Sequence, residues 1–135
     1  MTKEDAIKVL AILKAAYPNS YKNMTKKEAN GTVFIWATQF ANIPADIVMI
    51  AVNKLISTST FPPAISEVKA KVRGLYYEAY ELLEQNKRHK YLSAEQEAFY
   101  QKVMDVTEAM RCSNKPEPTL YELTSGGAYP LLNGG

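Results

Sequence analysis

One short stretch decides how this chain folds: TFPPAISEV, residues 60–68. Each proline fixes φ and lacks a backbone N–H, so the Pro62-Pro63 pair ends an incoming helix and is tolerated in the first turn of the next one. The residue before a proline is pushed toward extended conformations. We therefore expect two helices joined by an elbow, with Phe61 in the elbow and its ring turned toward the core.

Before the elbow, the sequence predicts three amphipathic helices. Thr2 with Asp5 and Thr25 with Glu28 have the spacing of capping boxes, in which side chain and backbone bond reciprocally at a helix start. Pro18 and its polar neighbours are expected to end the first helix. The residues expected in the core, which follow helical spacing, are Leu10, Leu13, Trp36, Phe40, Val52, Leu55 and Phe61.

After the elbow, apolar residues recur every three or four positions, as in a coiled-coil seam. They are Ile65, Val68, Val72, Leu75, Ala79 and Leu82, followed after a polar break at 86–90 by Phe99, Val103, Val106 and Met110. This pattern predicts one long helix over 64–90 that projects from the N-terminal unit. An antiparallel partner is expected over 94–111, with a capping box at Ser93 and Gln96. Gly74 lies inside the long helix, where a glycine indicates a bend or a domain edge.

The predicted fold is therefore all-α with three parts. Residues 1–73 are expected to form an N-terminal helical domain, 74–112 a helical hairpin, and 113–135 a flexible tail. The tail holds three of the seven prolines and four of the six glycines, and its helical periodicity is lost.

Composition excludes several classes of protein. The 135 residues carry a net charge of only +2, too little to argue for nucleic-acid binding by itself. Cys112 is the only cysteine, so an internal disulfide is impossible and a reducing compartment is expected. The N-terminus is unlike a secretory signal, and no apolar run approaches the roughly 20 residues that span a bilayer. We expect a soluble protein in the cytoplasm.

Catalytic and cofactor motifs are missing from the sequence. It contains no Gly-rich phosphate loop, and one histidine (His89) with one cysteine cannot build a conventional zinc site. No pair of carboxylates shares an apolar setting that would separate two pKa values for acid–base work. We therefore expect a protein that is not an enzyme and needs no metal or cofactor.

Several segments of the N-terminal half resemble the replicative-helicase loader and inhibitor family of tailed phages that infect Gram-positive bacteria. They are Ile7-Lys8-Val9-Leu10, Ala15-Ala16-Tyr17-Pro18, Trp36 to Phe40, Val48 to Ile56, and Thr60 to Val68, within residues 3–73. The resemblance implies a helical protein that binds a hexameric DnaB-type helicase, holds it inactive and delivers it to origin DNA opened by a phage initiator. It also implies a C-terminal region that is poorly ordered when free, whereas residues 75–111 here are patterned as a hairpin.

The resemblance assigns helicase binding to the C-terminal region. This region also has apolar residues that the predicted N-terminal core does not use. The candidate partner-binding residues are Tyr76, Tyr80, Lys87, Arg88, Tyr91, Leu120, Tyr121 and Leu123, with a further apolar patch at 129–132. Tyrosine is enriched at interface hot spots, although the same side chains could simply cover the hairpin. Cations near the end of a helix also complement its dipole without any ligand.

Two other functions remain open from the sequence. A DNA-binding accessory protein would need a basic face, for which the candidates are Lys69, Arg73, Lys87, Arg88 and Lys90. Glutamates at 67, 78, 81 and 84 lie among these basic residues and offset their positive charge, so direct DNA binding is expected to be weak or absent. A structural protein that dimerises through the 65–82 seam is the second alternative.

Overall fold

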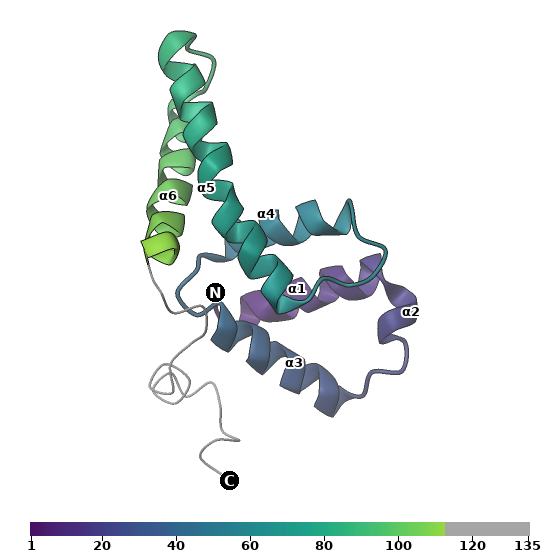
Figure 1. Cartoon of the computed structure of the whole chain (residues 1–135). Helices are drawn as coiled ribbons and strands as arrows, with labels where there is room; N and C mark the ends of the chain where they lie inside the picture. Colours follow the sequence, from purple (N-terminus) through teal and green to yellow (C-terminus); the bar gives the residue numbers. More distant parts are fainter. Residues whose placement is uncertain (113–135) are drawn as a thin grey trace.

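The computed structural model describes residues 1–112, and these form α-helices without any strand. The helices are α1 (Lys3–Ala16), α2 (Pro18–Tyr21), α3 (Lys26–Gln39), α4 (Ala45–Ile56), α5 (Ile65–Arg88) and α6 (Ala94–Cys112) (Figure 1). The all-α prediction is confirmed. The partner-binding residues predicted at Leu120, Tyr121, Leu123 and 129–132, and the predicted tail, lie outside the described residues.

Local capping sets the starts of the first long helices, as predicted. The Thr2 hydroxyl accepts a bond from the Asp5 N–H at 3.2 Å, and the Asp5 carboxylate accepts one from the Thr2 N–H at 3.0 Å. Thr25 caps α3 by accepting from the Glu28 N–H at 3.1 Å, but only half of the predicted capping box forms, because the Glu28 carboxylate accepts from the Thr25 hydroxyl instead of the Thr25 N–H. Pro18 does more than end α1, because it is the first residue of the short helix α2, which the sequence reading missed. A proline is well suited to that position, since its missing N–H would have no partner there.

One hydrophobic core joins all the long helices. Trp36 is only 6% exposed, and its ring lies 5.3 Å from that of Phe40. The other buried apolar residues are Ala6, Val9, Leu10, Leu13, Val33, Ile43, Ile47, Val48, Ala51, Val52, Val68, Val72, Leu75, Ala79 and Val103. Leu55 is partly buried against them. The core prediction therefore holds for six of its seven residues, counting Leu55 as partly buried, and fails at Phe61.

Phe61 is 77% exposed, so the prediction that its ring turns inward is wrong. The elbow is tied down from another side, because the Tyr17 hydroxyl donates to the Ser59 carbonyl at 2.9 Å. Pro63 is the residue of the elbow that is buried. The prolines thus set the elbow's path, and that path carries the Phe61 ring to the surface.

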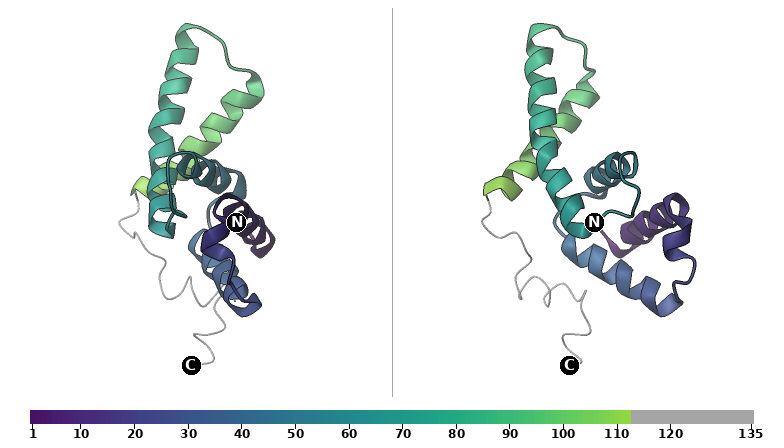
Figure 2. Two further views of the ribbon diagram at one scale, coloured as in Figure 1. Left: turned by 90° about the vertical axis from the view of Figure 1, so that its right-hand side faces the viewer. Right: turned by 45° about the vertical axis from the view of Figure 1, so that its right-hand side comes forward.

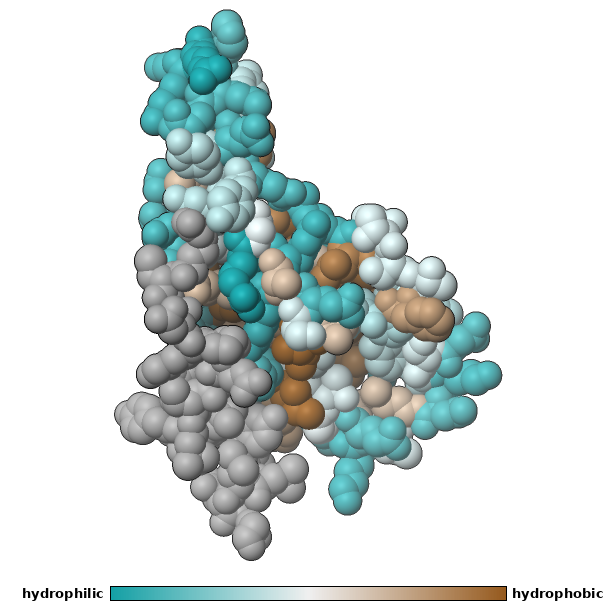
Figure 3. Space-filling view, in the orientation of Figure 1, coloured by the Kyte–Doolittle hydropathy of each residue, from teal (hydrophilic) through white to brown (hydrophobic). Residues whose placement is uncertain are grey.

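Helices α5 and α6 form an antiparallel hairpin that projects from the rest of the molecule (Figures 1 and 2). On the face shown in Figure 3, the projecting end is covered mainly by hydrophilic residues. Ion pairs join α4 to both helices, Lys54 to Glu78 at 3.4 Å and Asp46 to Lys102 at 2.9 Å. The predicted long helix and its partner are confirmed.

The seam of α5 packs within the chain. Val68, Val72, Leu75 and Ala79 are buried, and α5 contacts both α4 and α6. A second copy would have to displace these helices to use the same surface, which argues against dimerisation through residues 65–82. Helix α5 runs through Gly74 without interruption, and a bend or domain edge at that residue stays a prediction. The hydrophobic core extends across this position, and the division into domains at 73 and 74 stays a prediction.

Candidate protein-interaction surface

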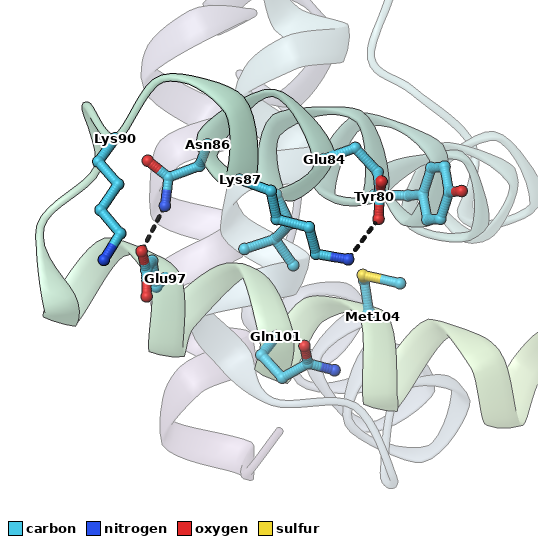
Figure 4. A pocket seen from close by; sticks show the side chains of 9 residues that line it. Tyr80, Glu84, Asn86, Lys87, Lys90, Glu97, Gln101 and Met104 are labelled. Carbon is cyan, nitrogen blue, oxygen red and sulfur yellow. Dashed lines mark hydrogen bonds and ion pairs between the residues drawn. The ribbon is translucent and has the colours of Figure 1, made fainter.

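Asn86 closes the projecting end of the hairpin. It is only 5% exposed, and its side-chain oxygen accepts bonds from the Tyr91 N–H at 2.8 Å and the Leu92 N–H at 2.9 Å. Its side-chain nitrogen donates to the Glu97 carboxylate (Figure 4). Sequence reasoning placed Asn86 only in a polar break. The available signal was its residue type, because asparagine before a turn often satisfies nearby backbone N–H groups.

The start of α6 is fixed by the predicted capping box. The Ser93 hydroxyl accepts from the Gln96 N–H at 3.1 Å, and the Gln96 side chain accepts from the Ser93 N–H at 2.9 Å. Both helix ends at the connection are therefore held by side chains. The hairpin presents its outer residues on a well-defined support, which lowers the entropy lost when a surface orders on binding.

Three tyrosines cluster on α5, as their spacing predicted. The rings of Tyr76 and Tyr80 are stacked, with centroids 6.4 Å apart and an interplanar angle of 13°. Tyr77 meets Tyr76 edge-on at 5.5 Å. Tyr77 and Tyr80 are 61% and 48% exposed, so the cluster leaves aromatic surface open to a partner. Such rigid aromatic area is typical of interface hot spots.

A pocket of about 320 Å³ lies between α5 and α6, next to this cluster. Tyr80, Leu83 and Met104 give it an apolar lining, and Asn86, Glu97 and Gln101 give it polar groups. Figure 4 shows the pocket residues of α5 facing those of α6. Glu84, Lys87 and Lys90 also line it, so six of the nine lining residues are polar or charged. The pocket therefore suits a partner side chain that has polar or charged groups beside an apolar part.

The basic residues at the end of α5 are exposed, and one of them is paired. Lys87 donates to the Glu84 carboxylate at 2.8 Å. This hydrogen bond, with the attraction between the two charges, raises the pKa of Lys87 above its ordinary value of 10.5. Arg88 and Lys90 are exposed, and His89 is the exposed C-cap residue of α5, as predicted for a helix-end histidine.

The structure brings only some of the predicted site residues together. Tyr80 and Lys87 line the pocket, while Tyr76 adjoins it through its stacking on Tyr80. Tyr91 lies at the hairpin connection, where its hydroxyl is 3.3 Å from the Leu82 carbonyl oxygen. Arg88 does not line the pocket. Sequence reasoning did not select the other seven pocket residues as partner-binding residues: Leu83, Glu84, Asn86, Lys90, Glu97, Gln101 and Met104.

Within residues 1–112, no three His, Cys, Asp or Glu side chains gather as a metal-binding group would. None of the helices described combines the length and apolar composition that a bilayer-spanning helix needs.

A helical bundle with a projecting, tyrosine-bearing hairpin defines this chain as a small all-α protein. The comparisons with known proteins specify its family. A family model for the N-terminal domain of a phage helicase loader and inhibitor matches residues 1–69, just over half of the 135 residues. The chain therefore belongs to this family of phage helicase loaders and inhibitors, whose role is an accessory one rather than a catalytic one. No curated protein and no solved structure matches the chain.

Proposed function

We propose that this protein binds a hexameric DnaB-type replicative helicase, holds it inactive and loads it at a phage origin. Family membership is the observation that carries this proposal. On this proposal the protein acts in the cytoplasm of the host cell, by binding and without hydrolysing nucleotide. A phage origin-binding initiator is a further partner.

We assign the helicase contact to the α5–α6 hairpin and to the chain beyond it. Two features support this assignment: the exposed rings of Tyr77 and Tyr80, and the adjoining pocket. Most apolar residues of the N-terminal helices are instead buried in the core, so they are not available to a partner. Aromatic residues that rim a pocket are the residue type most often found to carry binding energy.

Point substitutions in the full chain test the assignment better than truncation. A chain ending at Arg73 would lose Leu75, Ala79 and Val103 from the core, so its loss of binding could reflect unfolding. We therefore suggest Tyr80→Ala with Lys87→Gln as the test variant. Phe61→Ala is the matched control, because this exposed aromatic lies on the elbow before α5 and does not line the pocket.

The measurement is a pulldown of purified helicase hexamer, with and without a non-hydrolysable nucleotide. We expect the wild type and the control to retain helicase, and the hairpin variant to bind about 30-fold more weakly, as for the loss of a hot spot. Full affinity of the hairpin variant would place the contact elsewhere. Failure of the wild type to bind either phage or host helicase would refute the function itself.

A further inference from the structure

The corner formed by the end of α1, the short helix α2 and the start of α3 is strongly basic. Between residues 6 and 45 the sequence holds five lysines and a single acid, Glu28. Four of those lysines lie at this corner, and we call them the lysine corner: Lys14, Lys22, Lys26 and Lys27. Lys14 is in the last turn of α1, Lys22 follows α2, and the other two begin α3. All four are exposed.

The views of the fold agree that these segments are neighbours. Helix α2 links the end of α1 to the start of α3 at one end of the bundle, far from the tip of the hairpin (Figures 1 and 2). Hydrophilic residues project at the rim of this end of the molecule in Figure 3, with pale and hydrophobic residues between them. The basic face considered from the sequence lay on α5. The lysine corner is a different surface, and the overall charge of +2 conceals it because acids are concentrated elsewhere.

The lysine corner is not explained by the stability of the fold. None of its four side chains forms an ion pair with another described residue, whereas Lys54, Lys87 and Lys102 all do. Glu28, the nearest acid in sequence, accepts a hydrogen bond from the Thr25 hydroxyl at 3.2 Å. Lys26 and Lys27 lie in the first turn of α3, where the helix dipole disfavours cations. Like charges held together in this way cost stability unless a polyanion neutralises them.

The residues around the lysine corner favour a nucleic acid, rather than an acidic protein, as the polyanion that would neutralise its charge. Protein interfaces usually need exposed apolar or aromatic anchors. Among the described residues, no exposed large apolar side chain lies between Lys14 and Lys27, and the elbow that the Tyr17 hydroxyl holds adds one exposed ring, Phe61. The exposed residues between Lys14 and Lys26 include the small polar residues Asn19, Ser20 and Asn23. Lysines with small polar donors are the groups that contact phosphates, which position a protein on DNA without reading its sequence.

We propose that the lysine corner binds the phosphate backbone of DNA without sequence specificity. The hairpin and the lysine corner would then be separate contact surfaces. This contact does not depend on the helicase proposal, because it is measured on the isolated protein.

The test is fluorescence anisotropy of the full-length protein with labelled DNA, single-stranded or duplex with the same sequence, over a series of salt concentrations. If all four lysines contact phosphates, log Kobs should fall against log salt with a slope of roughly −3.6 for duplex and roughly −2.8 for single strands. The variant Lys22→Gln/Lys26→Gln/Lys27→Gln should bind about tenfold or more weakly at low salt, and its slope for duplex should shrink to roughly −0.9.

Two further variants test whether DNA binding depends on the charge of the lysine corner or only on the net charge of the whole protein. Lys22→Arg/Lys26→Arg/Lys27→Arg keeps the charge and should restore binding. Lys71→Gln/Arg73→Gln/Lys102→Gln removes the same net charge from α5 and α6 and should bind like the wild type. Circular dichroism melts check that each variant is folded.

Three results would overturn the proposal. The first is no binding to either DNA at low salt. The second is equal weakening by the α5–α6 control variant, which would show a general charge effect. The third is tighter binding of a polyglutamate peptide of matched charge than of DNA, which would make an acidic protein the partner.

Discussion

Replacing Asn86 with alanine should loosen the closed end of the α5–α6 hairpin. The substitution removes one buried side chain that makes three hydrogen bonds, two from the N–H groups of Tyr91 and Leu92 and one to Glu97. Since α6 packs mainly on α5, the connection between them controls how firmly α6 is held.

The magnitude follows from those contacts. A hydrogen bond contributes about 0.5–1.5 kcal/mol net, and leaving a buried donor without a partner costs about 1–3 kcal/mol. Tyr91 is exposed and Leu92 is partly exposed, so water can replace some of what they lose. We therefore expect Asn86→Ala to lower the free energy of unfolding by about 2–3 kcal/mol, in the lower half of the range of about 1.5–4.5 kcal/mol for three such bonds.

Urea unfolding followed by circular dichroism measures this loss. Hydrogen exchange of the α6 amides would show whether the hairpin opens before the rest of the molecule. Asn53→Ala is the matched control, because Asn53 is exposed on α4 and alanine favours a helix, so its stability should be unchanged or slightly higher. A loss below about 0.5 kcal/mol for Asn86→Ala, within the range of ordinary surface substitutions, would refute the reasoning.

Trp36→Ala should lower the free energy of unfolding by about 3–5 kcal/mol in urea denaturation, because the indole is buried in the core, and an unchanged midpoint would contradict that. Phe61→Ala should change it by less than about 0.5 kcal/mol, and a larger loss would mean that the ring packs inward after all. Gly74→Ala should raise the melting temperature through a gain of up to about 1 kcal/mol, since an added Cβ meets no atom within 4 Å; a lower melting temperature would point to strain. The Thr2 backbone and side-chain hydrogen bonds hold the pKa of Asp5 below its ordinary value of 3.8. The stability contributed by this carboxylate is present above pH 3.8 and is lost as the pH falls through the lowered pKa, so Asp5→Asn should reduce the acid-side slope of a melting series.

Short-range features of this protein could be predicted from the sequence. The caps at Thr2, Thr25 and Ser93 were identified correctly because a cap involves residues only two or three positions apart. The helices on either side of the elbow followed from apolar residues three and four apart, which share one face of a helix. The prolines marked where the chain had to turn. The family resemblance likewise rested on this well-patterned half, and the family match covers residues 1–69.

Other features were decided only by the tertiary structure. A helical pattern says which face is apolar, but it does not say which way a loop side chain points, so Phe61 could be placed only after the elbow was built. Asn86 differs from an ordinary polar residue because the hairpin brings the Tyr91 and Leu92 N–H groups to it. The lysine corner arises because α2 brings the end of α1 to the start of α3. Local rules depend on covalent neighbours, whereas exposure and surface charge depend on which distant segments the core brings together.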